Sequence, residues 1–319
     1  MADASKVVRL AEAVRREVAK AVVGQTEVVD ALLVGVITGG HVLIEGVPGT
    51  AKTLIARAVA RALDVSFKRI QFSPDMMPAD VVGTNVYDAE RQEFYLRRGP
   101  IFANIVLADE VNRTPPKTQA ALLEAMQEQS VTIDGVAHPL PSPFLVVATQ
   151  NPVEYEGTYP LPEAQLDRFA QKVVVGYPPA DDERAILARH TGGMQMPDFE
   201  AIGLSAVASG ADVLEARAAL DAVVVDEGVL DYVSAVVRAT REHPAVFLGA
   251  SPRAGVSVLV SAKARALMAG RTFITPDDVK ACAVAGLRHR ILLRPEVEIE
   301  GMETDAVVSD VLESVPVPR

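Results

Sequence analysis

The chain has 319 residues, 49% of them hydrophobic, and its formal net charge is −11. This length suggests about two domains with a sizeable core, and the acidic balance disfavours a nucleic-acid-binding protein, leaving room only for a local basic patch. Because no apolar run approaches the ~18 residues that span a membrane and no signal-sequence pattern opens the chain, we expect a soluble cytoplasmic protein.

Helical and strand patterns alternate along the first part of the chain. Helices are expected at 5–22, 26–37, 52–63 and 115–128. The last of these is predicted to start with Thr114 as N-cap and Pro115 at its first position. Buried strands are expected at 42–45, 67–72, 103–108, 144–149 and 172–176, and hairpins at 85–96 and 131–135. Such alternation favours an α/β fold with a mainly parallel sheet flanked by helices.

Strand patterns end after Tyr177, and Pro178 with Pro179 marks the predicted domain boundary. Beyond it only helices are expected, at 181–190, 226–242, 252–269 and 276–287, the last with Thr275 as its cap. We therefore predict an α/β domain over 1–178 and a smaller all-α domain over 179–319. The acidic stretch 296–310 is either an edge strand or a frayed tail, and we assign it no function.

The cysteine and histidine content points away from disulfides and structural zinc. The single cysteine, Cys282, cannot form a disulfide within the chain. It falls in a helical pattern, which favours a buried structural thiol over a nucleophile. None of the five histidines pairs with another His or with Cys at metal-ligand spacing, so we predict no structural zinc.

The most informative motif is the stretch 46–53, a glycine-rich turn between a buried strand and a helix. Gly46 and Gly49 lack side chains, so backbone N–H groups can approach phosphates there, aided by the following helix N-terminus. Lys52 would contact the β- and γ-phosphates of a nucleotide, and Thr53 would supply a hydroxyl to Mg²⁺. Position 51 is Ala where the pattern has Gly, which is tolerated if Ala51 already lies in the right-handed helical turn. An ordinary Gly-Pro turn is the alternative, which this context disfavours.

Polar residues that follow two further strands would complete the site. Asp109 and Glu110 follow the strand 103–108, at the carboxyl edge where open α/β sheets bind ligands. Asp109 can hold Mg²⁺ through its water shell, and Glu110 can polarise an attacking water; a solvated acidic strand end is the alternative. Asn151 can orient a water or touch the γ-phosphate, although an Asn-Pro turn is an equal alternative.

Two arginines are candidates for reading the nucleotide. Arg168 lies just before the last predicted strand, and Arg253 begins a helix of the second domain. An arginine that reaches the γ-phosphate offsets charge as the bond breaks. For either residue, a surface salt bridge is the usual alternative.

In combination, these motifs resemble the AAA+ ATPases, and more narrowly the MoxR family of the helix-2-insert clade. The resemblance extends from about Val22 to Arg290 and rests on 46–53, 107–113, 115–119, 122–128, 148–152, 156–162 and 161–169. It implies a P-loop AAA+ fold in which 179–319 forms a helical lid, and it makes Ala51 a family trait. ATP or ADP with Mg²⁺ on Thr53 and Asp109 is the implied ligand. Its implied contacts are Val23, Gly24, Gly46, Val47, Pro48, Gly49, Thr50, Ala51, Lys52, Thr53, Leu54, Asp109 and Arg253.

The resemblance also implies roles for individual residues. Beside Lys52 and Glu110, it makes Asn151 the sensor-1 residue, Arg168 an arginine finger acting on the neighbouring subunit's ATP, and Arg253 the sensor-2 residue of the lid. The adenine would lie between the lid and the segment 22–25. The hairpins at 85–96 and 131–140 look like the helix-2 insert and the pre-sensor-1 hairpin, which line the central face of a ring in relatives. A finger acting in trans requires an oligomer, and the family suggests a hexameric ring.

The leading hypothesis is an ATP-hydrolysing ring that remodels or activates partner proteins in a chaperone-like manner. The resemblance suggests partners with von Willebrand factor A domains, sometimes in metal-cofactor insertion. A nucleotide-gated binding module with little hydrolysis is one alternative, which intact Glu110, Asn151 and Arg168 disfavour. A helicase-like DNA motor is another, which the net charge of −11 disfavours. The pairs Lys68-Arg69 and Arg97-Arg98 could form a local patch, but are more commonly surface or interface charges.

Overall fold

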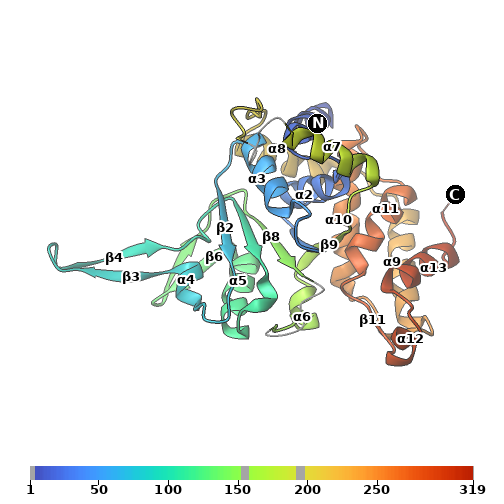
Figure 1. The fold of residues 1–319 in the computed structure, drawn as a ribbon. Helices are drawn as coiled ribbons and strands as arrows, with labels where there is room; N and C mark the ends of the chain where they lie inside the picture. Colours follow the sequence, from blue (N-terminus) through green and yellow to red (C-terminus); the bar gives the residue numbers. More distant parts are fainter. Residues whose placement is uncertain (1–3, 152–157, 192–197, 319) are drawn as a thin grey trace.

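A five-stranded parallel sheet forms the centre of the molecule in the computed structural model, which describes residues 4–151, 158–191 and 198–318 (Figure 1). The strand order is β2-β5-β8-β1-β9. The strands are β1 His41–Gly46, β2 Phe67–Gln71, β5 Ile105–Asp109, β8 Leu145–Gln150 and β9 Phe169–Val175. Every neighbouring pair is parallel, which confirms the predicted α/β sheet.

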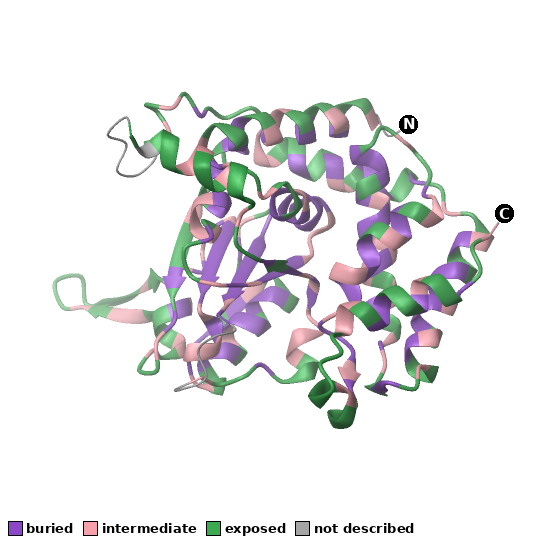
Figure 2. Cartoon of the chain, turned by 45° about the vertical axis from the view of Figure 1, so that its right-hand side comes forward, coloured by how far each residue is buried: buried purple, intermediate pink, exposed green. Residues whose placement is uncertain are grey.

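Side chains along the strands alternate between two hydrophobic clusters, one on each face of the sheet. On β1, Val42 and Ile44 belong to the first cluster, whereas Leu43 belongs to the second, as the period of two requires. The first cluster contains residues of α1, α2, α3 and the C-terminal helices, and the second contains residues of α4 and α5. These helices are α1 Ala4–Ala21, α2 Thr26–Thr38, α3 Lys52–Ala62, α4 Pro78–Val82 and α5 Pro116–Glu128. Figure 2 shows the buried strands enclosed between these layers.

The C-terminal half is mainly helical. Its helices are α7 Ala180–His190, α8 Gly210–Ala219, α9 Glu227–Glu242, α10 Pro252–Met268, α11 Pro276–Leu287, α12 Pro295–Ile299 and α13 Thr304–Ser314. Helix α8 was not predicted from the sequence, and its buried residues are Val213, Ala216 and Ala219. The expectation of helices alone is also wrong, since β10 Val246–Leu248 pairs with β11 Leu292–Leu293. Strands this short carry no periodic pattern.

The stretch 296–310 lies mostly in α12 and α13, so the expectation of an edge strand or a frayed tail is wrong. The buried residues of α13 are Val307, Val308 and Val311, a helical spacing that packs into the first cluster. None of the helices in the three described ranges is both long and apolar enough to cross a membrane. The domain division at 178 and 179 stays a prediction.

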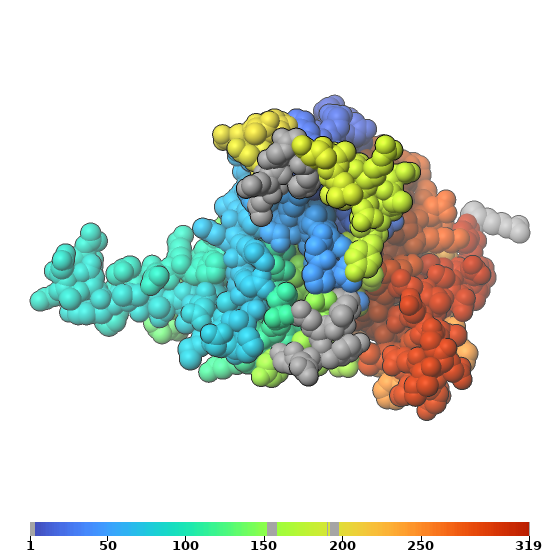
Figure 3. All heavy atoms as spheres, in the orientation of Figure 1, coloured from blue at the N-terminus to red at the C-terminus, as the bar shows by residue number. Residues whose placement is uncertain are grey.

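Both predicted hairpins are present. The first consists of β3 Gly83–Asp88 and β4 Glu93–Arg98, and it projects from the body of the molecule (Figures 1 and 3). The second consists of β6 Ser130–Ile133 and β7 Val136–Pro139. Its turn residues Asp134 and Gly135 have φ of 49° and 81°, the left-handed pair that a type I′ turn requires.

Thr114 is not the N-cap of α5, contrary to the prediction. The helix starts at Pro116, and Pro115 occupies the cap position without a side-chain bond. A residue before proline is driven to extended backbone, and this applies to both Thr114 and Pro115. In contrast, Thr275 caps α11 as predicted, because its side chain accepts a hydrogen bond from the N–H of Asp278. Cys282 lies buried on α11, also as predicted.

Candidate functional site

The loop between β1 and α3 uses its two glycines for different physical reasons. Gly49 has φ of 85°, and a Cβ built there would meet nothing within 4 Å, so the backbone faces open space. Gly46 closes β1, and a Cβ there would lie 2.5 Å from the carbonyl oxygen of Val175 on β9. Gly46 therefore permits close packing of two strands, and Gly49 leaves the loop open to a ligand.

Ala51 adopts a left-handed backbone, with φ of 59° and ψ of 17°, and it is the N-cap of α3. The expectation that Ala51 already lies in a right-handed helical turn is wrong. Its carbonyl accepts the first helical hydrogen bond, from the N–H of Ile55 at 2.9 Å, but its backbone still belongs to the loop. The left-handed conformation is the one for which the general motif has glycine.

Lys52 lies folded over the loop at the start of α3. Its Nζ donates to the carbonyl oxygens of Gly46 at 2.7 Å and Val47 at 2.8 Å. Burial lowers the pKa of Lys52, and the charges of Asp109 and Glu110 act to raise it. The Lys52 ammonium is therefore close enough to both carboxylates to interact with their charges.

Asp109 ends β5 and is held by partners from the two flanking strands. Its Oδ1 accepts a hydrogen bond from the hydroxyl of Thr149 on β8 at 2.5 Å. Its Oδ2 accepts two from Arg69 on β2, at 2.9 Å from Nε and 2.6 Å from a terminal nitrogen. Thr149 also accepts a bond from the N–H of Glu110 at 2.9 Å, so one buried hydroxyl links both acidic residues.

Glu110 has a left-handed backbone, with φ of 57°, at the point where the chain leaves the sheet. Its Oε2 accepts a hydrogen bond from Gln71 on β2 at 2.7 Å and lies 3.1 Å from Nε of Arg113. Sequence reasoning missed Arg69, Gln71, Arg113 and Thr149 as partners of the carboxylates. Arg69 and Gln71 are two residues apart on the edge strand β2 and therefore share one face of it. Only the strand order shows that they lie beside Asp109 and Glu110.

Asn151 follows β8 directly and is buried. Because β1, β5 and β8 are parallel neighbours, their carboxyl ends bring the loop, the acidic pair and Asn151 to one edge of the sheet. The motif 156–162 and Pro152 lie partly or wholly outside the described residues.

A cavity of about 580 Å³ opens beside the loop. Its walls come from the loop and the start of α3, from the segment after α1, and from α7 and its flanks. The lining residues include Val22, Val23, Gln25, Thr50, Leu54, Pro178, Ile186 and Ile202. Gly24, at φ of 65°, lies against the carboxylate of Asp182 on α7. This cavity adjoins the segment 22–25 where the resemblance predicts the adenine.

The two candidate arginines occupy different places. Arg168 lies between α6 Glu163–Leu166 and β9, and its guanidinium donates to the side chain of Gln127 and the carbonyl of Leu123, both on α5. Arg253 is the second residue of α10 and is exposed. The described structure therefore brings Lys52, Asp109, Glu110 and Asn151 together, whereas Arg168 rests against another part of its own chain.

The arrangement fits a site for a polyanion with a divalent cation. An open glycine loop and a helix N-terminus provide N–H donors, and Lys52 provides a positive charge. Thr53 at the start of α3 and Asp109 at the end of β5 carry the oxygen atoms that Mg²⁺ prefers as ligands. The residues present therefore fit a nucleoside triphosphate with its metal ion.

Comparisons with known proteins agree with this chemistry. The family described as ATPase family associated with various cellular activities (AAA) matches residues 41–171, and the AAA lid domain matches 238–311. Chaperone MoxR1 of Mycobacterium tuberculosis is 44% identical over 95% of this chain and 81% of its own length. The uncharacterised protein YeaC of Bacillus subtilis is 45% identical over 94% of this chain and 92% of its own.

A solved structure shows the same fold. It is that of a candidate ATPase from Cytophaga hutchinsonii, 42% identical, with a TM-score of 0.90 and coverage of 99% of this chain and 98% of its own. The likeness confirms the predicted α/β domain with its parallel sheet and the helical lid that follows. Since relatives that are 32–45% identical match over 81–94% of their own lengths, the chain belongs to the MoxR family of AAA+ ATPases.

Proposed function

We propose that the chain binds ATP with Mg²⁺ and hydrolyses it to ADP and phosphate. The observation that carries the proposal is the gathering of Lys52, Asp109, Glu110 and Asn151 at one edge of the sheet, beside an open glycine loop. Membership of an ATPase family supports it. The cavity next to the loop, with several apolar residues in its walls, suits a nucleotide base.

Each residue of the site has a separate role in the proposed hydrolysis. Lys52 exchanges its bonds to the loop carbonyls for bonds to phosphate oxygens. Thr53 and Asp109 hold Mg²⁺, which when bound neutralises charge on the phosphates. Glu110 accepts a proton from the attacking water at a carboxylate oxygen, and Asn151 orients that water. Gln71 and Arg113 hold Oε2 of Glu110 and thereby decide where its other oxygen lies.

We further propose a hexameric ring in which Arg168 leaves Gln127 and reaches the ATP of the neighbouring subunit, while Arg253 on the lid reaches the ATP of its own. Membership of the AAA+ family supports an oligomer. An arginine at a developing phosphate charge increases turnover by orders of magnitude, roughly 10³–10⁵ in well-studied cases. Arg168→Ala should therefore abolish turnover while the chain still binds ATP.

The test of hydrolysis combines nucleotide affinity and turnover for three variants. Glu110→Gln should keep ATP affinity and lose turnover, and Lys52→Ala should lose affinity. The matched control is Glu12→Gln, an exposed glutamate on α1, which should leave both unchanged. Normal turnover in Glu110→Gln would exclude the mechanism, and tight ATP binding without turnover in the unsubstituted chain would indicate a nucleotide-gated module instead.

The task of the ring is proposed to be remodelling of client proteins, a chaperone-like role. The relative named Chaperone MoxR1 supports this direction. Von Willebrand factor A domain proteins, some in metal-cofactor insertion, are the proposed clients. Affinity capture with Glu110→Gln in ATP should enrich such a protein over capture with Lys52→Ala. Equal recovery with both variants would contradict a nucleotide-dependent client.

A further inference from the structure

Arg290, which follows α11, lies buried between the lid helices and the turn that carries Arg168. Its side chain is only 2% exposed. A guanidinium removed from water needs partners for its donors, because each unpaired donor costs free energy. The positions of those partners therefore show which parts of the molecule Arg290 holds together.

On one side, Arg290 forms hydrogen bonds with the residues around Arg168. Its Nε donates to Oδ1 of Asp167 at 2.6 Å. Its terminal nitrogens donate to the carbonyl oxygens of Asp167 at 3.0 Å, Phe169 at 2.7 Å and Ala170 at 3.4 Å. These residues flank Arg168 on both sides, so the backbone of the turn is held while the Arg168 side chain remains on α5.

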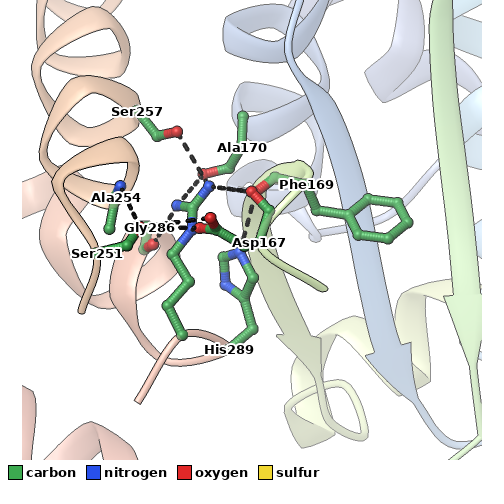
Figure 4. Close-up of polar contacts among 9 residues, drawn as sticks. Asp167, Phe169, Ala170, Ser251, Ala254, Ser257, Gly286 and His289 are labelled. Carbon is green, nitrogen blue, oxygen red and sulfur yellow. Dashed lines mark hydrogen bonds and ion pairs between the residues drawn. The ribbon is translucent and has the colours of Figure 1, made fainter. Parts of the chain in front are cut away.

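On the other side, Arg290 binds two lid helices. It donates to the carbonyl of Gly286 on α11 at 2.6 Å and to the hydroxyl of Ser257 on α10 at 3.0 Å. Ser251, the N-cap of α10, lies 3.4 Å from both carboxylate oxygens of Asp167. Figure 4 shows these lid residues facing Asp167, Phe169 and Ala170 across the cluster.

Arg253 belongs to the same neighbourhood. It follows Ser251 by two residues on α10. Burial lowers the pKa of Arg290, Asp167 opposes this shift, and the positive charge of Arg253 adds to the lowering. The helix that carries Arg253 and the turn that carries Arg168 are thus both hydrogen-bonded to the buried guanidinium of Arg290.

We propose that Arg290 is a positioning residue that couples the lid to the arginine finger. Resting on the proposed function, the inference is that the lid's placement over its own nucleotide is transmitted through Arg290 and Asp167 to Arg168, which acts on the next subunit. The guanidinium is a rigid planar fork, so the lid cannot shift without moving the carbonyls of 167, 169 and 170 or breaking their bonds. A lysine would keep the charge but lose the fork.

The first test compares the turnover and nucleotide affinity of Arg290→Lys with those of Arg271→Lys. Arg271 is the matched control, because it makes a two-bond pair with Asp278 inside the lid, at 2.6 Å and 2.6 Å. Arg290→Lys should lower kcat by about tenfold to a hundredfold, as a misplaced catalytic group does, and leave the Kd for a fluorescent ATP analogue with Mg²⁺ within about twofold. Unchanged kcat, or an equal loss of affinity and kcat, would overturn the proposal.

Mixed rings then locate the defect. Chains with Glu110→Gln cannot hydrolyse, so in a mixture they affect turnover only through their wild-type neighbours. When Arg290→Lys is introduced into the Glu110→Gln chains as a second substitution, turnover per wild-type subunit should fall as strongly as when Arg168→Ala is introduced instead. Turnover equal to that with Glu110→Gln alone would place the defect in the chain's own site and overturn the coupling.

Amide hydrogen exchange provides a readout that does not depend on hydrolysis. Exchange in 163–170 should rise in Arg290→Lys and in Asp167→Asn, which leaves Arg290 in place, and should stay unchanged in Arg271→Lys. Unchanged exchange in both variants would overturn the proposal. Normal turnover in Arg168→Ala would exclude the proposed role of Arg168 as an arginine finger. If only the coupling through Arg290 is absent, Arg168→Ala should still abolish turnover.

Discussion

At the scale of single residues, the loop between β1 and α3 shows how a motif tolerates a departure at a measurable cost. Ala51 occupies the left-handed region that Gly would enter freely. A non-glycine residue there loses about 1–2 kcal/mol, which neighbouring structure must offset. The family-like Ala is therefore strained, even though the rest of the loop fits a phosphate site.

Ala51→Gly is expected to stabilise the protein. Glycine removes the strain of the left-handed conformation from the folded state, and this gain exceeds the free-energy cost of the larger conformational entropy of the unfolded chain. The free energy of unfolding should therefore rise by about 0.5–1 kcal/mol. Urea denaturation measures the change. The control is Ala56→Gly in the right-handed interior of α3, which should lower the free energy of unfolding by at least about 1 kcal/mol. Destabilisation by both substitutions would show that Ala51 is not strained.

Thr149→Val tests the hydroxyl that links the acidic pair. Valine keeps the shape but removes the donor to Asp109 and the acceptor for the N–H of Glu110, where Thr149 is 1% exposed. We expect a loss of about 1–3 kcal/mol in the free energy of unfolding, because buried polar groups lose partners. Turnover should fall as well. Thr149→Ser, which restores the hydroxyl, should recover most of both, and equal losses in the two variants would exclude the hydroxyl as the cause.

At the scale of elements, local capping decides where the lid helices begin. Thr275 and Asp278 form a capping box at the start of α11, with the N–H of Thr275 bound by Asp278 at 2.9 Å. Arg271 adds a two-bond ion pair to the same carboxylate. Burial raises the pKa of Asp278, but the bonds from Arg271 and Thr275 outweigh it and the pKa is lowered.

Thr275→Ala should lower the free energy of unfolding by about 1 kcal/mol, the usual cost of a lost cap. Because the pKa of Asp278 is lowered in the folded state, this carboxylate contributes stability above its ordinary pKa and loses it as the pH falls through the lowered value. Urea denaturation of Thr275→Ala and Thr275→Ser at neutral pH measures the cap. No difference between the two variants would contradict a role for the hydroxyl.

At the scale of the whole molecule, two buried histidines join separate layers. Nε2 of His41 lies 2.9 Å from the carbonyl oxygen of Met126 on α5, and Nδ1 accepts a bond from the N–H of Val146 on β8. Nε2 of His289 lies 3.0 Å from the carbonyl oxygen of Phe169 on β9, next to the lid. Burial lowers the pKa of His41 to about 4 and that of His289 to about 3.

These histidines should make the protein acid-labile. Between the ordinary pKa of 6.5 and the lowered value of about 4, His41 takes up a proton in the unfolded chain but not in the folded one. Lowering the pH through this window therefore favours unfolding, by up to about 3 kcal/mol for His41. The free energy of unfolding from pH 7 to pH 4.5 measures the slope.

A variant isolates the contribution of His41. His41→Gln should flatten the decline of stability with falling pH, whatever its effect on absolute stability. The control is Thr132→Gln, at an exposed residue of hairpin strand β6, which removes no titratable group and should leave the decline as it is. An unchanged slope in His41→Gln would contradict a depressed pKa for this residue.

The sequence alone determined the parallel sheet, the loop with Lys52 and Thr53, and the position of Asp109 and Glu110 at a strand end. These features depend on local periodicity and on spacing within a few residues, which the chain carries directly. The tertiary structure decided what holds the acidic pair, because Arg69 and Thr149 reach Asp109 only through the strand order. It also decided the tie between Arg290 and Asp167, 123 residues apart, which only packing of the lid against β9 brings into contact. No local pattern encodes such pairs, since burial of a charge becomes favourable only when the distant partner is in place.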